Sequence, residues 1–195
     1  LAQMRGGEHA VNAQAVMREL RGLPDHIQTV LDRMDRVIEI ARFMADSRSV
    51  LFLGRNVGYP IALEGALKLK EIAYIHAEGF AAGELKHGPI ALIEPGQPVF
   101  IVVPGPDTPH ELHKKVVSNI QEIRARGART LVIAEDGDED VVPFADEVIR
   151  VPATLPLLMP LLTIVPLQIF ALHLATAKGL DVDQPRNLAK SVTVE

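Results

Sequence analysis

The sequence predicts an α/β fold, a three-layer αβα sandwich in which a mostly parallel sheet lies between two layers of helices. Four short apolar runs predict buried strands: SVLFL at 49–53, PVFIVV at 98–103, RTLVIA at 129–134 and EVIRV at 147–151. Helical patterns of about 12 residues or more fill the gaps between these runs, and this alternation is typical of right-handed βαβ units. Helices cover both faces of such a sheet, which explains why the runs are continuously apolar.

Length and composition fit one globular domain with a short helical segment in front of it. Of the 195 residues, 48% are hydrophobic and 23% charged, which excludes a mostly disordered chain. The formal net charge of -5 argues against nucleic acid or an anionic membrane surface as a partner. The chain has no cysteine, which excludes disulfides, thiolate zinc sites and a cysteine nucleophile within it. It starts at Leu1 without a visible secretory signal, so we expect a piece of a longer protein.

Helical periodicity predicts helices before and between these strands. Apolar residues recur at spacings of three and four after Pro24, which stands where a helix would begin. The sequence therefore predicts an amphipathic helix over 24–45, with a weaker helical stretch at 9–20. Further helices are predicted over 59–74 and over 112–126, the latter ended by a glycine.

Residues 155–177 are overwhelmingly apolar and about long enough to cross a bilayer. Three prolines, Gln168 and His173 interrupt this segment, and it directly follows one of the predicted sheet strands. The sequence therefore favours a buried or interface helix over a transmembrane span. If the helix is apolar on all sides, a partner subunit is the natural cover for its outer face.

The densest polar chemistry lies in residues 59–89. On a helix, Glu64, Lys68 and Glu71 fall on one side, spaced by four and three. The small or apolar side chains fall on the opposite side, at Ala62, Ala66, Leu69 and Ala73. One interpretation is a solvated face with weak ion pairs, worth roughly 0.3 kcal/mol each. The other is a carboxylate made suitable for proton transfer by an adjacent ammonium group.

His87 stands in the sequence GELKHGP, in a turn closed by a Gly-Pro pair and away from any apolar stripe. A histidine in such a turn is a candidate acid or base at neutral pH. His76 and Glu78 could join His87 as metal ligands, but no further residue has convincing spacing, so we expect no metal site.

Ligands of parallel α/β sheets lie beyond the carboxyl ends of the strands, which points to residues 54–58, 104–108 and 135–140. The first of these loops could cradle a phosphate at a helix N-terminus. However, Pro60 removes a backbone N–H and the loop contains no Ser or Thr, so a tight turn is favoured. The tail at 181–195 has no period and fits a frayed terminus. The alternative interpretation of this tail is functional: the small residues that flank Lys190 would let its amine be desolvated and act as a nucleophile.

Three segments together change this interpretation: ALEGALKLKEIAYIHAE at 62–78, GELKHGP at 83–89 and DQPRNLAKSVTVE at 183–195. They resemble the second sugar-isomerase (SIS) domain at the C-terminus of the glucosamine-6-phosphate synthase family, the glutamine:fructose-6-phosphate amidotransferases. The resemblance implies a five-stranded, flavodoxin- or Rossmann-like parallel sheet. It also implies a helical lead-in or inter-domain linker at 1–46, and an SIS domain at 47–195 whose residues 181–195 form a catalytic tail.

The resemblance also implies roles for individual residues. Glu71 resembles the acid–base that moves a proton between C1 and C2 of the sugar, and Lys68 matches the lysine beside that carboxylate. His87 resembles the histidine that opens the sugar ring, which the neighbouring subunit donates in this family. Lys190 resembles the tail lysine that forms an imine with the open-chain ketose.

Glu64 and Ala189 complete the implied site as substrate-contacting residues. The implied reaction converts fructose 6-phosphate and glutamine to glucosamine 6-phosphate and glutamate, without a cofactor, in the cytoplasm, as a step towards UDP-GlcNAc. The implied partners are a second copy of the chain and, on the same polypeptide, a glutaminase domain and a first SIS domain.

Two departures from the family pattern affect the expected activity. Asn56 stands where the family has glycine, and the family's phosphate loop lies in the first SIS domain, which this sequence lacks. We therefore expect a chain that carries catalytic residues but is inactive as an isolated fragment. Two alternatives stay open at this point: a stand-alone SIS domain that senses sugar phosphates, and a unit whose isolated role is dimerisation through 155–178.

Overall fold

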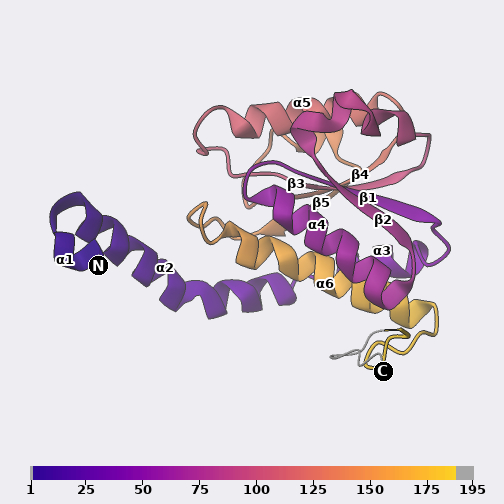
Figure 1. Cartoon of the computed structure of the whole chain (residues 1–195), viewed down its shortest axis with the longest axis horizontal. Coiled ribbons are helices and arrows are strands. Elements are labelled where there is room, and N and C mark those ends of the chain that lie inside the picture. Colours follow the sequence, from indigo (N-terminus) through magenta and orange to yellow (C-terminus); the bar gives the residue numbers. More distant parts are fainter. Residues whose placement is uncertain (1, 188–195) are drawn as a thin grey trace, which may run out of the picture.

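The computed structural model describes residues 2–187 and contains one five-stranded sheet (Figure 1). The strands are β1 (Ser49–Gly54), β2 (His76–Ala81), β3 (Pro98–Val102), β4 (Arg129–Glu135) and β5 (Glu147–Val151). They lie in the order β2-β1-β3-β4-β5, and every neighbouring pair is parallel. The predicted α/β class is thereby confirmed, and so is the five-stranded parallel sheet that the family resemblance implied.

Helices cover both faces of the sheet. Figure 1 shows α3 (Asp35–Phe43), α4 (Gly58–Lys68) and α6 (Met159–Ala177) on one face, and α5 (Leu112–Arg124) on the other. Because successive side chains of a strand point to opposite faces, Phe52 of β1 enters one core and its neighbours Leu51 and Leu53 enter the other. Phe52 stacks on Phe100 at 5.3 Å between ring centroids, and Phe100 meets Phe170 of α6 edge-on at 4.6 Å.

The predicted helix over 24–45 is wrong in its boundaries. The short α1 (Ala2–Arg5) is followed by α2 (Gly7–Leu31), which contains Pro24 in its interior, and α3 begins only at Asp35. The chain turns at 32–34, where Met34 is buried and Arg33 forms an ion pair with Asp136 at 2.9 Å. Apolar spacing continues across this turn because both α2 and α3 send side chains into the same core.

Strand β2 has no counterpart in the strand pattern read from the sequence. Its residues, HAEGFA, contain no β-branched side chain and pair with β1 alone at the edge of the sheet. A Cβ on Gly79 would lie 2.9 Å from the Cα of Leu63, so glycine is needed for the close approach of α4. The strand therefore forms because of tertiary packing, which periodicity does not reveal.

By length and composition, α6 could span a membrane, which agrees with its apolar sequence. Half of its most apolar window is buried inside the structure, and core helices of proteins pass the same test. This is weak support for a span. The helix packs instead against α3, α4 and the first core cluster.

Candidate functional site

A row of three charged side chains lies on the outer face of α4 and the turn that follows it. The Nζ of Lys68 lies 2.6 Å from Glu71 Oε2 and 3.3 Å from Glu64 Oε1. All three side chains are partly shielded, with exposed fractions of 29% for Lys68, 27% for Glu71 and 38% for Glu64. The opposite face of the helix is buried, as the sequence predicts, at Ala62, Ala66, Leu69 and Ala73.

The two carboxylates fix the charge of the lysine between them. The hydrogen bond to Glu71 raises the pKa of Lys68 above its usual value; burial opposes this rise, and Glu64 adds to it. Lys68 is therefore a stable cation at neutral pH. The partial shielding of the row makes these ion pairs stronger than those of a fully solvated helix face.

A π-helical turn positions Glu71. The α-helix ends at Lys68 and continues as a π-helix over Leu69–Ala73, which is a geometry often found at functional sites. Tyr74 then adopts a left-handed conformation with φ of 54° and ends the helix. The chain turns at this point and enters β2 at His76.

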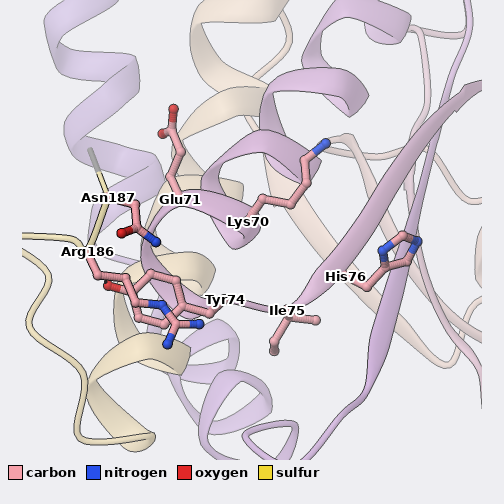
Figure 2. A pocket seen from close by; sticks show the side chains of 7 residues that line it. All are labelled: Lys70, Glu71, Tyr74, Ile75, His76, Arg186 and Asn187. Atoms are coloured by element: carbon pink, nitrogen blue, oxygen red, sulfur yellow. Dashed lines mark hydrogen bonds between the residues drawn. The ribbon is translucent and has the colours of Figure 1, made fainter. Parts of the chain in front are cut away.

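Glu71 lines a cavity of about 500 Å³. The other lining residues are Lys70, Tyr74, Ile75, His76, Arg186 and Asn187, and Figure 2 shows how they lie. A volume of this size fits a small-molecule ligand. The cavity lies at the amino end of β2 and not beyond the carboxyl ends of the strands, where the general rule for parallel sheets would place it.

The last described part of the tail is held against the π-helical turn. The Arg186 guanidinium lies 4.1 Å from the centroid of the Tyr74 ring, and the backbone N–H of Arg186 donates to the Tyr74 hydroxyl at 2.8 Å. Sequence analysis missed both residues because they are 112 positions apart. The predicted site residues Ala189 and Lys190 lie outside the described residues.

His87 does not lie in this cavity. It is exposed and ends the 3₁₀ turn η2 (Ala82–His87), beyond the carboxyl end of β2, while Glu71 precedes the amino end of the same strand. The six residues of β2 span roughly 20 Å at about 3.3 Å per residue. The structure thus brings Glu64, Lys68 and Glu71 together but separates His87 from them. The neighbouring Lys86 holds the 3₁₀ turn against α5 through an ion pair with Glu122 at 2.8 Å.

The loop at 54–58 is a tight turn closed on itself. The N–H of Gly58 donates to the Arg55 carbonyl at 3.0 Å, and a Cβ on Gly54 would lie 2.0 Å from the Gly58 carbonyl oxygen. Asn56 adopts a left-handed conformation with φ of 52°, which asparagine tolerates better than most residues. The replacement of the family's glycine by Asn56 is therefore compatible with the turn.

A group of possible metal ligands lies elsewhere, at His113, Asp138 and Asp140, with donor atoms within 4.8 Å of one another. Sequence spacing did not indicate it. His113 Nε2 and Asp138 Oδ2 are already hydrogen-bonded at 2.8 Å, and Asp138 Oδ1 accepts the N–H of Asp140 at 3.2 Å. These contacts explain the group as a buried polar pair that fixes the loop after β4. Of His76, Glu78 and His87, which the sequence analysis weighed and set aside as metal ligands, only His76 and Glu78 lie together, at 3.4 Å.

The carboxyl ends of β3 and β4 border a second cavity of about 360 Å³. Its lining residues are Glu19, Gly105, Asp107, Thr108, Glu135, Ala153, Thr154, Leu155 and Pro156. Burial raises the pKa of Glu135; the backbone N–H of Thr154 opposes this rise, and nearby Asp138 adds to it. None of the predicted catalytic residues among residues 2–187 lines this cavity.

Comparison with known proteins gives one consistent family. Residues 43–178 match the SIS domain. Over all 195 residues, the chain is 70% identical to the glutamine–fructose-6-phosphate aminotransferase (isomerizing) of Leifsonia xyli subsp. xyli and 63% identical to that of Corynebacterium glutamicum. It covers 32% and 31% of those proteins, so it spans about a third of the length of these relatives.

A solved structure agrees with this comparison. The C-terminal domain of glucosamine-fructose-6-phosphate aminotransferase from Francisella tularensis superposes with a TM-score of 0.79 and 39% sequence identity. The superposition covers 86% of this chain and 46% of that one. Tagatose-6-phosphate ketose/aldose isomerase from Escherichia coli, at a TM-score of 0.72 and 22% identity over 84% of this chain and 45% of that one, shares the fold.

Glu135→Gln is expected to raise the melting temperature at neutral pH, because it removes a carboxylate that must ionise while half-buried. Because burial raises its pKa, the Glu135 carboxyl keeps its proton to a higher pH in the folded protein than in the unfolded chain. The destabilisation by Glu135 is therefore absent at low pH and appears as the pH rises from the unfolded pKa through the folded pKa. The gain from the substitution should shrink towards about pH 4, near the ordinary pKa of glutamate.

Thermal unfolding across this pH range checks the prediction. The matched control is Glu111→Gln, which changes a carboxylate that is 71% exposed and should leave the melting temperature almost unaltered. A gain from Glu135→Gln that is equal at every pH, or a loss at neutral pH, would contradict the assigned cause.

Proposed function

The chain belongs to the SIS domain family, and from this we propose that it is the second sugar-isomerase half of a glutamine–fructose-6-phosphate aminotransferase. The whole enzyme would make glucosamine 6-phosphate and glutamate from fructose 6-phosphate and glutamine, in the cytoplasm. The observation that carries the proposal is the Glu71 carboxylate, held by the protonated Lys68 at the edge of a cavity of about 500 Å³. We propose the boundaries 1–46 for the lead-in and 47–195 for the SIS domain.

In this proposal Glu71 is the acid–base of the isomerisation. It takes a proton from C1 of the protonated open-chain sugar imine; the C–H electron pair forms a double bond between C1 and C2, and the C=N pair moves onto the nitrogen. The same proton then returns to C2 while the C1 hydroxyl releases its proton to water and becomes the aldehyde, so the carboxylate is regenerated and no cofactor is needed. Lys68 stabilises the ionised carboxylate while bound sugar excludes water, and Glu64, on the other side of Lys68, would contact the substrate.

Lys190 would supply the amine that activates the ketose. Its neutral amine adds to the C2 carbonyl, water leaves, and the resulting imine is open to exchange with ammonia released from glutamine. Lys190 follows Asn187 by three residues, which limits the backbone between them to about 10 Å, and Asn187 lines the same cavity as Glu71. The chain length thus supports this role, with Ala189 as the adjacent substrate contact.

His87 would open the sugar ring in the cavity of a neighbouring copy. An acid–base must come within hydrogen-bond reach of its proton, and β2 separates His87 from the Glu71 of its own chain by roughly 20 Å. This separation supports a homodimer with shared sites. Exposed leucines on α4 and α6, at Leu63, Leu67, Leu161 and Leu172, offer an apolar surface for such contacts.

The remaining functions would come from parts outside this chain. The relatives are about three times as long, which leaves room for a glutaminase domain and a first SIS domain that binds the sugar phosphate. The tight turn at 54–58 supports this division, because the N–H groups of Gly58 and Tyr59 donate to the Arg55 and Asn56 carbonyls within it. The isolated chain is accordingly proposed to be inactive.

Glu71→Gln in the full-length aminotransferase is expected to lower kcat for glucosamine 6-phosphate formation by roughly 10²–10⁴-fold, the usual contribution of general acid–base catalysis. Glutamine keeps the shape of the side chain and an oxygen that accepts the hydrogen bond from Lys68, so the melting temperature should stay nearly constant. The effect is measured as the rate of glucosamine 6-phosphate formation from fructose 6-phosphate and glutamine, in samples quenched at successive times. Glu111→Gln serves as the control, and near-normal isomerisation by Glu71→Gln would exclude the proposed role.

Lys68→Met is expected to lower kcat/KM for glucosamine 6-phosphate formation by roughly tenfold or more, because it removes the charged hydrogen-bond donor that holds the Glu71 carboxylate at 2.6 Å. The hydrogen bond to Glu71 raises the pKa of Lys68, so this donor is a cation at neutral pH. Lys68→Arg retains the charge and a donor and should lose much less activity. A normal kcat/KM in Lys68→Met, measured by the same product assay, would contradict the assigned role.

A further inference from the structure

The 3₁₀ turn that carries His87 is anchored on α5. Ala82 and Leu85 of this turn are buried in the core on the α5 side of the sheet, where they join three apolar side chains of that helix: Val116, Ile120 and Ile123. Lys86 follows Leu85, and its Nζ lies 2.8 Å from Oε1 of Glu122, which is also on α5. His87 itself is exposed, so its position follows from the residues that hold the turn.

Glu122 is only partly accessible to water. Its side chain is 21% exposed, and its second carboxylate oxygen, Oε2, is buried without a hydrogen-bond partner among the described residues. A carboxylate shielded in this way costs free energy unless a cation compensates its charge. Among residues 2–187, the ammonium group of Lys86 is the cation that pairs with Glu122. The shielded carboxylate therefore fixes Lys86 more firmly than a fully solvated ion pair would.

The chain is also held on the other side of His87. Pro89 begins a second 3₁₀ turn, and Ile90 packs against the same core on the α5 side of the sheet. Only His87 and Gly88 lie between Lys86 and Pro89. The direction of the His87 side chain therefore depends on how firmly Lys86 is held.

We propose that Glu122 is a positioning residue that acts through Lys86 and directs the His87 imidazole towards the sugar ring bound in a neighbouring copy. This inference rests on the proposed function, in which His87 opens that ring. In the opening step, the imidazole takes the proton of the C2 hydroxyl, the C2–O5 bond breaks as the C2 carbonyl forms, and the proton passes to O5. Both oxygens must come within hydrogen-bond distance of the imidazole, so a small displacement of the turn slows the step.

The contact between Glu122 and Lys86 is remote from the Glu71 carboxylate. Helix α5 covers the face of the sheet opposite to α4, as Figure 1 shows, and Glu122 does not line the cavity that contains Glu71. A substitution of Glu122 can therefore slow ring opening without altering the proton transfer between C1 and C2.

The test compares two substrates of the full-length aminotransferase. Fructose 6-phosphate closes to a furanose ring, whereas 5-deoxyfructose 6-phosphate lacks the hydroxyl that closes this ring and stays open. Glu122→Gln removes the charge and keeps the shape of the side chain. It should lower kcat/KM for fructose 6-phosphate roughly fivefold and leave kcat/KM for the open-chain substrate unchanged. Equal slowing with both substrates, or normal kinetics with fructose 6-phosphate, would overturn the proposal.

Lys86→Met removes the other partner of the ion pair. It should cause the same loss of roughly fivefold, and the double variant with Glu122→Gln should be no slower than either single variant, because one contact is lost in all three. Lys86→Arg retains the cation and should keep a normal kcat/KM. Losses that multiply in the double variant would contradict the action of Glu122 through Lys86.

Glu111→Gln is the matched control, because it neutralises a glutamate beside α5 whose ion pair with Lys114, at 3.6 Å, is exposed. Both substrates should react with this variant at normal rates. Amide hydrogen exchange gives a second readout: exchange of the Lys86 and His87 amides should be faster in Glu122→Gln and unchanged in Glu111→Gln. Unchanged exchange in Glu122→Gln would also overturn the positioning role.

His87→Ala separates this proposal from the proposed function. This variant should be slow with fructose 6-phosphate and nearly normal with the open-chain substrate. Equal slowing of His87→Ala with both substrates would refute the ring-opening role in the proposed function. A selective loss in His87→Ala together with normal kinetics of Glu122→Gln would refute only the positioning role of Glu122.

Discussion

The close approach of α4 to the sheet is the constraint on which the site depends. A Cβ on Gly65 would lie 2.7 Å from Leu167 of α6 and 3.0 Å from Phe52 of β1, and a Cβ on Gly79 of β2 would lie 2.9 Å from the α4 backbone. With glycine at these positions, α4 packs against β1, β2 and α6 at once. The face with Ala62 and Ala66 is buried in this packing, and Lys68 and its two carboxylates lie on the partly exposed face.

The same packing determines where Glu71 and His87 lie relative to each other. The helix returns the chain to the amino end of β2, so Glu71 precedes the strand and His87 follows it. A sugar is much shorter than this strand, and no rotation of side chains removes the separation. Within the proposed function, each polypeptide would therefore give its carboxylate to one site and its histidine to another, which makes the second copy part of the chemistry.

The sequence predicts the central strands well because SVLFL, PVFIVV and RTLVIA are buried on both faces and need no information beyond their own composition. It predicts the charged face of α4 because helical spacing alone separates Lys68 from Ala66. It does not reveal β2, whose strand conformation comes from pairing with β1. It also misses the break between α2 and α3, where apolar spacing continues across a turn.

Contacts between distant positions are a further limit. Neither the Tyr74–Arg186 contact nor the His113–Asp138 pair follows from local pattern, because each joins segments that only the folded sheet brings together. Local sequence marks Lys190 and His87 only as candidates, and the motif resemblance supplies their expected roles. The structure adds that His87 does not line the Glu71 cavity of its own chain.

The measurement that tests this account most directly is complementation between Glu71→Gln and His87→Ala in the full-length aminotransferase, co-expressed with different affinity tags. Each variant alone should be inactive. If sites are shared, mixed dimers hold one site with both groups intact, and random pairing should restore about a quarter of normal activity. No recovery in purified mixed dimers would contradict shared sites, because both groups would then have to act within one chain.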